Sequence, residues 1–399
     1  MSKKRKKKKI LFVISTLTGG GAERTLCNIT CGLPDDVMAD ILINYETEQD
    51  YPHKGNVISL GMPKRKKFSL GYQFVTVIRR YIRLRQLKAQ GGYDACISFM
   101  DSANIANVLS GKKHCKVILS ERINLSSCTS AGYRYIVGPL AKLLYPRANY
   151  MVSLSKGVEA DLIENYNLPK KCAVTIYNGY SIDTIQKKAQ EPSAIEIEKD
   201  KFYFISVGRL CEQKGQWHLI KAFREVVKKH PQSRLIICGK GPYLPMLEQM
   251  AQKYGLSDYV IFAGFQKNPY AIAAKCNVFV FPSNYEGFGS AMIENMACGL
   301  PVISTDYRSG AREILAPDTD FRMQQLETIE RAEYGILVPV CKSSIEMSGE
   351  ENEPEENLLA NAMNILIEEE QTYNQYKELS LKRAKEFSIE RTVEKWLSL

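Results

Sequence analysis

Two glutamates lie eight residues apart around a loop that contains glycine. The loop follows an apolar run at 278–281, expected to be a buried strand, and opens the segment PSNYEGFGSAMIENMACGLPVI at 282–303. Glu286 falls in the loop, and Glu294 falls on the helix expected after it. Between them lie Gly287, Phe288 and Gly289. Ligands of α/β sheets bind at the carboxyl ends of strands, so carboxylates in this pattern indicate a ligand site.

Two cations follow an earlier apolar run. The segment SVGRLCEQKG at 206–215 comes at the end of a strand expected over 202–207. Arg209 and Lys214 lie on the connection to the next helix, where both can meet one polyanion. Arginine offers a fork of donors to phosphate oxygens, and lysine offers a compact charge. The pattern favours a phosphate site, and a solvated basic loop is the alternative.

Three glycines lie in the first strand-to-helix turn of the sequence, TLTGGGAERTLCNI at 16–29. Gly20 and Gly21 would let the backbone approach a ligand, and the N-terminus of the following helix would favour an anion. The glycine spacing is not that of a dinucleotide-binding turn. A tight turn without a ligand is the alternative.

The elements that must position these residues alternate along the chain. Short apolar runs are separated by helical patterns, which predicts parallel sheets covered by helices. The alternation restarts after a polar stretch at 186–201. We therefore expect an α/β protein of two Rossmann-like domains, with an N-terminal domain over 1–182, a linker over 183–200 and a C-terminal domain over 201–384.

These motifs resemble the paired-glutamate signature of the retaining glycosyltransferases of family four, which have the GT-B fold. The resemblance covers most of the second domain and includes Glu286, Glu294 and the two cations. Further similar segments are GGAER at 20–24, IYNGYSID at 176–183, ICGKGP at 237–242, GLPVIST at 299–305 and FSIERTVEKWLSL at 387–399. The resemblance implies two domains facing each other across a cleft, with the acceptor bound by the first domain and the nucleotide-sugar by the second. It also implies that the C-terminal helix at 385–399 packs back on the first domain.

The same resemblance implies a role for each site residue. Glu294 would accept hydrogen bonds from ribose hydroxyls, and Glu286 would hold the transferred sugar with the backbone N–H groups of 287–289. The two cations would neutralise the diphosphate, where charge grows as the glycosidic bond breaks. The implied catalytic residues are Arg209, Lys214 and Glu286, and Glu121 is added to them as a candidate on the acceptor side. The implied nucleotide-sugar-binding residues are Gly20, Gly21, Gly208, Gly239, Gly287, Phe288, Gly289 and Glu294.

No metal and no cofactor is implied by the resemblance, because the two cations take the place of a metal ion. The chain has one Asp-x-Asp pair, Asp318 and Asp320, in a polar loop after Pro317 rather than after an early buried strand. The eleven cysteines are scattered singly, with several in apolar runs. This usage is typical of buried thiols in a reducing cytoplasm.

The first domain departs from the family pattern at one place. Many members carry a histidine after a middle strand, near the reacting sugar, where this chain has ILSERIN at 118–124. Ser120 or Glu121 stands in that place, and the four histidines are elsewhere. Glu121 is expected either to contact the acceptor or to pair with Arg122 or Arg24.

The front of the chain is strongly basic. Residues 3–9 are a basic run, and residues 51–93 contain ten Lys or Arg and no Asp or Glu. The segment 64–88 mixes these cations with apolar residues in a helical pattern, which suits an anionic membrane surface. A basic face on an ordinary helix is the alternative.

No nucleic-acid-binding module is evident, so no nucleic-acid partner is expected. No apolar run could span a bilayer and no secretory signal is evident, so we expect a cytoplasmic protein on the inner face of the membrane.

The function expected from these features is transfer of a hexose or N-acetylhexosamine from a nucleotide diphosphate sugar, most simply a UDP-sugar. The acceptor would be lipid-linked or a polysaccharide, as in capsule or exopolysaccharide assembly. Two alternatives stay open: a sugar-nucleotide 2-epimerase of the same fold, and a non-catalytic sugar-binding scaffold.

Overall fold

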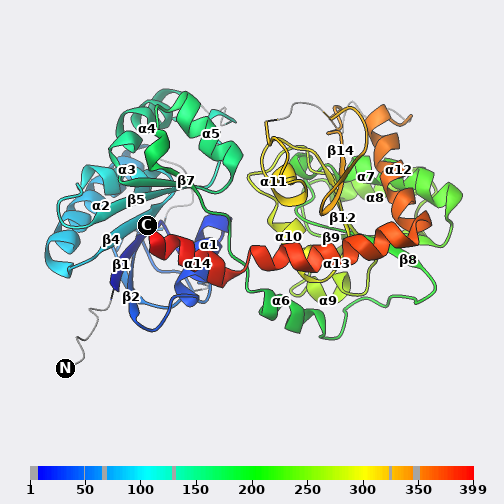
Figure 1. Ribbon diagram of the computed structural model, residues 1–399, viewed down its shortest axis with the longest axis horizontal. Helices are drawn as coiled ribbons and strands as arrows, with labels where there is room; N and C mark the ends of the chain where they lie inside the picture. The colour runs from blue at the N-terminus through cyan, green and yellow to red at the C-terminus, as the bar shows by residue number, and fades with distance from the viewer. Residues whose placement is uncertain (1–7, 49, 65–69, 128–131, 323–325, 345–350) are drawn as a thin grey trace. The chain divides into compact units, whose positions relative to one another are not determined.

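The computed structural model describes residues 8–48, 50–64, 70–127, 132–322, 326–344 and 351–399. The chain forms two compact units, Met1–Gly179 with Ile389–Leu399, and Tyr180–Ser388 (Figure 1). Residues 183–200 were expected to be a linker, but most of helix α6 (Ile182–Ala189) lies within them. α6 packs on α9 and α10 of the second unit.

The first unit is built on a sheet whose described strands are all parallel. In spatial order they are β3 (Asn56–Ser59), β2 (Val37–Ile43), β1 (Lys8–Val13), β4 (Ala95–Phe99), β5 (Lys116–Glu121), β6 (Tyr150–Ser153) and β7 (Ala173–Thr175). The direction of winding reverses between β1 and β4. This is the strand order of a Rossmann-like domain, and loops after these two strands diverge to leave a binding edge.

Helices cover both faces of this sheet because its strands are apolar on both sides. Ile10 and Phe12 pack against α1 and α14, whereas Leu11 and Val13 pack against α2 and α3 on the other face. The helices are α1 (Gly21–Cys31), α2 (Leu70–Gly91), α3 (Asp101–Leu109), α4 (Gly138–Leu144), α5 (Lys156–Asn165) and α14 (Ile389–Ser398). The short turns are η1 (Leu125–Ser127), η2 (Tyr133–Val137), η3 (Tyr145–Arg147) and η4 (Lys170–Cys172). The C-terminal helix α14 thus belongs to the first unit, where Trp396 is buried beside Phe99, with the ring centroids 5.8 Å apart.

The second unit repeats the arrangement. Its described strands, in spatial order, are β10 (Val260–Gly264), β9 (Ser233–Cys238), β8 (Phe202–Val207), β11 (Val278–Phe281), β12 (Val302–Thr305), β14 (Gly335–Val338) and β13 (Glu330–Ala332). Winding reverses between β8 and β11. All pairings are parallel except that of β13 with β14, which the sequence pattern did not predict. The α/β class with two Rossmann-like domains is confirmed.

The helices of the second unit include α6 and seven others. These are α7 (Gln216–Lys229), α8 (Leu244–Lys253), α9 (Tyr270–Ala273), α10 (Ser290–Ala297), α11 (Ala311–Leu315), α12 (Pro354–Glu368) and α13 (Glu370–Glu386). Of these, α7, α8 and α12 share one core with the sheet. On the other side α10 packs on α13 and contacts β11 and β12.

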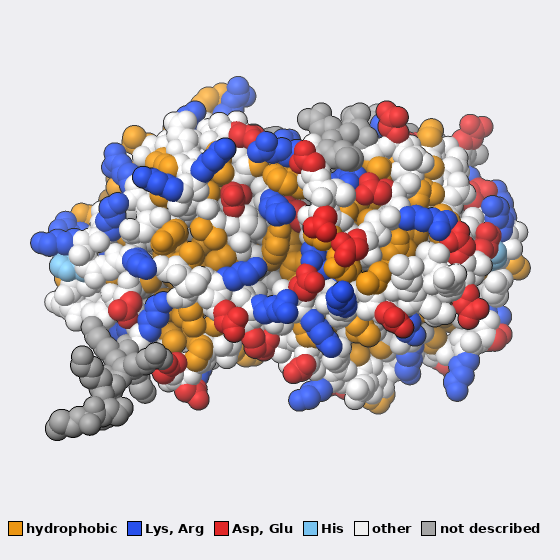
Figure 2. Space-filling view, in the orientation of Figure 1, with side chains coloured by type: hydrophobic (Ala, Val, Ile, Leu, Met, Phe, Trp, Pro, Cys, Tyr) orange, Lys and Arg blue, Asp and Glu red, His pale blue; other side chains and the backbone are white. Residues whose placement is uncertain are grey.

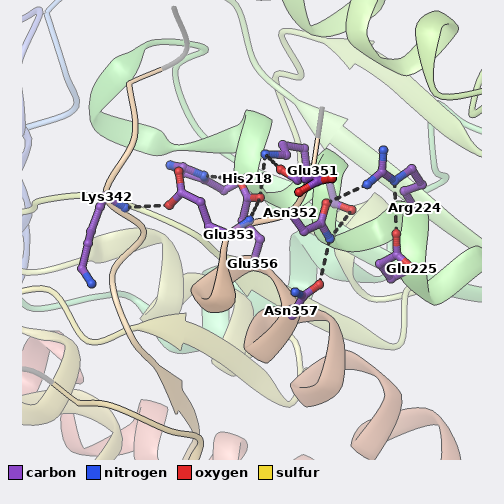
Figure 3. Close-up of polar contacts among 10 residues, drawn as sticks. His218, Arg224, Glu225, Lys342, Glu351, Asn352, Glu353, Glu356 and Asn357 are labelled. Carbon is purple, nitrogen blue, oxygen red and sulfur yellow. Dashed lines mark hydrogen bonds and ion pairs between the residues drawn. The ribbon is translucent and has the colours of Figure 1, made fainter. Parts of the chain in front are cut away.

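A buried polar cluster ties α7 to α12 (Figure 3). Glu356 is fully buried; its carboxylate lies 2.7 Å from Nδ1 of His218 and 2.8 Å from Nζ of Lys221. Glu356 also completes a capping box with Glu353 at the start of α12. Because α7 begins directly after Gly215, this cluster anchors the helix that follows the cation-bearing connection. His218 therefore has a structural partner within the unit.

Candidate functional site

The carboxyl edge of the second sheet brings two sequence-distant loops together. β8 and β11 are neighbours, so the connection after Val207 lies beside the loop after Phe281. The backbone N–H of Asn284 donates to the Gln213 carbonyl at 2.9 Å. Gly215 has φ +60°, and a Cβ there would lie 2.2 Å from the Pro282 carbonyl oxygen. Only glycine permits so close an approach between the two loops.

Lys214 and Glu286 meet at this junction. Lys214, in the turn η5 (Glu212–Lys214), places Nζ 2.5 Å from Oε1 of Glu286. The same oxygen accepts the Ser283 hydroxyl at 3.0 Å, and Nζ lies 4.7 Å from the centre of the Phe281 ring. The lysine and glutamate side chains are 16% and 11% exposed, so the pair is largely shielded but open on one side. Such a pair can serve a ligand with anionic and hydroxyl groups together.

The remaining predicted residues of this unit lie around the pair. Arg209 is exposed just after β8, and its guanidinium donates to Oε1 of Gln213 at 3.4 Å. Glu294 is half-buried on α10, which begins directly after Gly289. Gly239 follows β9, and its backbone lies against that of Gly208. A Cβ at Gly239 would lie 1.8 Å from the Gly208 carbonyl oxygen, so the contact requires glycine. Phe288 is buried, and its carbonyl accepts the Tyr307 hydroxyl at 3.0 Å. Gly287 lies in the loop between β11 and α10.

The glycine turn of the first unit opens α1 as expected. Gly20 is the N-cap, and Gly21 is the first helical residue. The Thr25 hydroxyl donates to the Gly21 carbonyl at 2.8 Å and lies 3.1 Å from Oδ1 of Asn178. The same oxygen accepts a hydrogen bond from the Arg122 guanidinium at 3.2 Å. Asn178 therefore links the start of α1 to the end of β5.

Glu121 ends β5 as one member of a buried carboxyl pair. The Tyr145 hydroxyl lies 3.0 Å from Asp101 Oδ1 and 3.4 Å from Glu121 Oε2, and the Tyr133 hydroxyl lies 2.5 Å from Asp101 Oδ2. One tyrosine hydrogen cannot serve both carboxylates. Burial, reinforced by the charge of Asp101, raises the pKa of Glu121 well above its usual value. The Glu121 side chain is fully enclosed and accepts the Arg122 backbone N–H at 2.9 Å.

Residues that the sequence did not single out complete both edges. Asp101 lies just after the end of β4, separated from it by Met100, and that position is its only sequence signal. Ser283 and Asn178 gave no separate signal, although Asn178 lies inside the segment IYNGYSID. Ser120, the other candidate for the histidine position, is buried, and among the described residues its hydroxyl has no hydrogen-bond partner.

Metal-binding side chains are not grouped in the part of the chain that the structure describes. There, no three or more His, Cys, Asp or Glu lie close enough to hold an ion. Asp318 and Asp320 are exposed, and Asp320 accepts the backbone N–H of Arg322 at 2.9 Å. Over the same described ranges, no helix is long and apolar enough to cross a membrane.

Comparison with known proteins gives consistent matches. Residues 187–321 match the family model described as glycosyl transferases group 1. Over 335 residues the chain is 31% identical to an uncharacterized glycosyltransferase of Methanocaldococcus jannaschii, covering 80% of this chain and 82% of the relative. It is 28% identical, over 95% of both chains, to the N-acetylgalactosamine-N,N'-diacetylbacillosaminyl-diphospho-undecaprenol 4-alpha-N-acetylgalactosaminyltransferase of Campylobacter jejuni.

Solved structures match the fold over nearly the full chain. HepE of Anabaena, solved in complex with UDP, superposes with a TM-score of 0.72 at 21% identity, covering 98% of this chain and 99% of HepE. Sucrose-phosphate synthase of Thermosynechococcus elongatus superposes with a TM-score of 0.72 at 19% identity, covering 98% of both chains.

Proposed function

Because the chain belongs to the group 1 glycosyltransferases, we propose that it transfers a hexose or N-acetylhexosamine from a UDP-sugar to a lipid-linked or polysaccharide acceptor. The observation that carries the proposal is the shielded Lys214–Glu286 pair at the reversal point of the second sheet. This is where doubly wound sheets bind nucleotides. HepE, similar in fold, was solved with UDP, which supports uridine as the nucleoside.

In this proposal each side chain acts on a different part of the donor. Arg209 and Lys214 hold the diphosphate and offset the negative charge that grows on it as the glycosidic bond breaks. Glu294 accepts hydrogen bonds from the ribose hydroxyls. Glu286 accepts hydrogen bonds from hydroxyls of the transferred sugar, while the N–H groups of 287–289 donate to that sugar. Fixed donors and charges of this kind need no reorganisation during the reaction.

The proposal includes transfer with retention of the configuration at the sugar carbon. The acceptor hydroxyl attacks from the face that the diphosphate leaves, and the leaving phosphate oxygen takes the hydroxyl proton. The sugar–oxygen bond to the diphosphate breaks as the bond to the acceptor oxygen forms. No metal ion is required in this scheme, since Arg209 and Lys214 carry the balancing charge.

A lipid-linked acceptor is supported by the Campylobacter relative, whose name describes an undecaprenol diphosphate-linked substrate. The first unit also carries exposed apolar side chains that suit a membrane surface. On α2 these are Phe74, Val75, Ile78 and Ile82, and on η2 and α4 they are Tyr135, Ile136, Leu140 and Leu143. Exposed cations at Arg79, Arg83 and Arg85 flank those of α2. Figure 2 shows basic and apolar side chains gathered over the region of α2, α3 and α4.

Membrane binding is tested by sedimentation with anionic vesicles. Each cation near such a surface contributes about 1 kcal/mol, so Arg79, Arg83 and Arg85 changed together to Gln should release most of the protein. Phe74→Ser should also weaken binding, because its ring is 69% exposed and would insert among the lipids. Residues 3–7 and 65–69 lie outside the described residues, and Lys8 and Lys9 belong to β1, so the basic run at 3–9 is tested separately by deleting residues 3–7 alone. Unchanged binding of the triple variant at low salt would remove the membrane proposal.

The transfer itself is tested with pure protein, a panel of nucleotide sugars and a short polyprenyl diphosphate-linked glycan. We expect UDP to raise the melting temperature, since a ligand specific for the native state stabilises it. One UDP-sugar should be consumed only when the acceptor is present. Interconversion of the donor without transfer would favour the 2-epimerase, and binding without turnover would favour the scaffold.

A further inference from the structure

Arg80 of α2 is a fully buried cation with neutral neighbours. Its guanidinium donates to Ser102 Oγ at 3.0 Å, to Asn44 Oδ1 at 2.6 Å and to Ser15 Oγ at 3.5 Å. Among the described residues no carboxylate pairs with it, and its Nε has no hydrogen-bond partner. The undescribed residues of this unit, 1–7, 49, 65–69 and 128–131, include no Asp or Glu. Burial lowers the pKa of Arg80 to about 10, which leaves the group charged at neutral pH.

The guanidinium of Arg80 lies at the carboxyl edge of the first sheet. Ser15 and Asn44 follow β1 and β2, and Ser102 lies in the first turn of α3, after β4. A helix N-terminus carries partial positive charge, so α3 adds to the charge of Arg80 rather than offsetting it. Asp101, in the same turn, directs its carboxylate to two tyrosine hydroxyls. An uncompensated cation buried in this way is costly.

A second buried cation on the same helix shows the contrast. Lys88 donates to the carbonyls of Asn107 and Gly111 at 3.1 and 3.0 Å, at the C-terminal end of α3. Free carbonyls and the negative end of the helix dipole lie there. Lys88 thus has a structural explanation, whereas Arg80 lies at the opposite end of α3, where a structural role would favour an anion.

We propose that Arg80 and the N-terminal turn of α3 bind a phosphate group of the acceptor substrate. The inference builds on the proposed function: the second unit holds the donor, which leaves the first unit to bind the acceptor. A phosphate oxygen would take the place of the Ser15 hydroxyl, whose contact with Arg80 is long, and would supply the missing negative charge. The Ser15 and Ser102 hydroxyls can rotate to donate to the same phosphate, and the guanidinium fork matches its geometry. The acceptor is then a phosphate- or diphosphate-bearing molecule rather than a neutral glycan.

The decisive variant is Asn44→Asp, which places a carboxylate of the same shape against the guanidinium. It should stabilise the protein by completing an ion pair while displacing the phosphate. Asn149→Asp adds the same charge to the same unit at the amino edge of the sheet, where Asn149 accepts the Val117 backbone N–H at 2.9 Å. A lower melting temperature for Asn44→Asp than for the wild type would contradict an uncompensated Arg80.

Binding is measured by calorimetry with inorganic diphosphate as the probe, with UDP present to occupy the second unit. Asn44→Asp and Arg80→Met should each lose about ten- to a hundredfold in affinity, the size expected for a hydrogen-bonded charge. Asn149→Asp should bind as the wild type does. Equal affinity in a folded Asn44→Asp would overturn the proposal and make Arg80 structural.

Transfer assays distinguish a phosphate on the acceptor from free phosphate in solution. With a polyprenyl diphosphate-linked glycan, Asn44→Asp should raise KM about ten- to a hundredfold. With the same glycan lacking phosphate, wild type and variant should be equally poor. If the variant changes diphosphate binding but not this KM, the site takes free phosphate and the acceptor assignment is wrong. If the wild type transfers no sugar from any donor, the proposed function is overturned, whatever diphosphate affinity Asn44→Asp shows.

Discussion

Replacing Glu121 by Gln should stabilise the protein increasingly as the pH rises. Glu121 is fully buried and faces Asp101, Tyr145 and the backbone of Arg122. Its pKa is raised in the folded state, first by burial and then by the charge of Asp101. Above pH 4.5, the usual value, the unfolded chain releases the Glu121 proton while the native state keeps it. The native state then binds more protons, so stability falls as pH rises.

The slope of this loss is fixed by one proton. It is at most about 1.4 kcal/mol per pH unit, so the wild type should lose up to about 3 kcal/mol between pH 5 and pH 7 relative to Glu121→Gln. The glutamine keeps an acceptor for the Arg122 N–H and presents donors to Asp101. Below pH 4.5 the two proteins should be nearly equal in stability.

The assay is urea unfolding at pH 5, 6 and 7, with Glu48→Gln as the control. Glu48 is an exposed carboxylate of the same unit, so its loss changes the net charge without touching the buried pair. A stability difference between Glu121→Gln and wild type that stays flat with pH would show that Glu121 is ionised in the native state. The inference that Glu121 keeps its proton beside Asp101 and Tyr145 would then be wrong.

Two further predictions concern the donor edge. Gly215→Ala should lower turnover sharply and cost at least about 1–2 kcal/mol of stability, because its Cβ would meet the Pro282 carbonyl. Gly255 has a similar positive φ and nothing within 4 Å of an added Cβ, so Gly255→Ala should lower the stability measured by circular dichroism and leave turnover unchanged. Equal losses of turnover in the two variants would show that the close approach of Gly215 to Pro282 does not matter for transfer. Excess chelator should leave turnover unchanged, because Arg209 and Lys214 offset the diphosphate. Restoration of a lost activity by manganese or magnesium would contradict this.

The fold was predictable because its signals are local. Apolar runs such as 278–281 and the helical pattern after Gln216 define strands and helices within a few residues. The short strand β13 and the helix α6 were missed, because one is three residues long and the other lies in a polar stretch that resembles a linker. Their stability comes from packing on neighbours, which no local pattern records.

The site was predictable only in part, for a related reason. Glu286 and Lys214 were found from their motifs, and their contact follows from the adjacency of β8 and β11. Asp101 was not found, because its partnership with Glu121 depends on two strands and a distant tyrosine. Arg80 and Lys88 belong to the basic segment 64–88 that suggested a surface face, but α2 turns both side chains inward.

The central claim is that Glu294 and Glu286 hold different parts of one donor. It is tested most directly by calorimetric binding of UDP measured beside initial transfer rates for Glu294→Ala and Glu286→Ala, with Gln at each position as the control for shape. Glu294→Ala should weaken UDP binding about ten- to a hundredfold, the size expected for a hydrogen bond to a charged group. Glu286→Ala should bind UDP at least as well as wild type, because Lys214 loses its carboxylate partner, and yet should transfer sugar very slowly. Equal loss of UDP affinity in both variants, or full turnover in Glu286→Ala, would contradict the assignment.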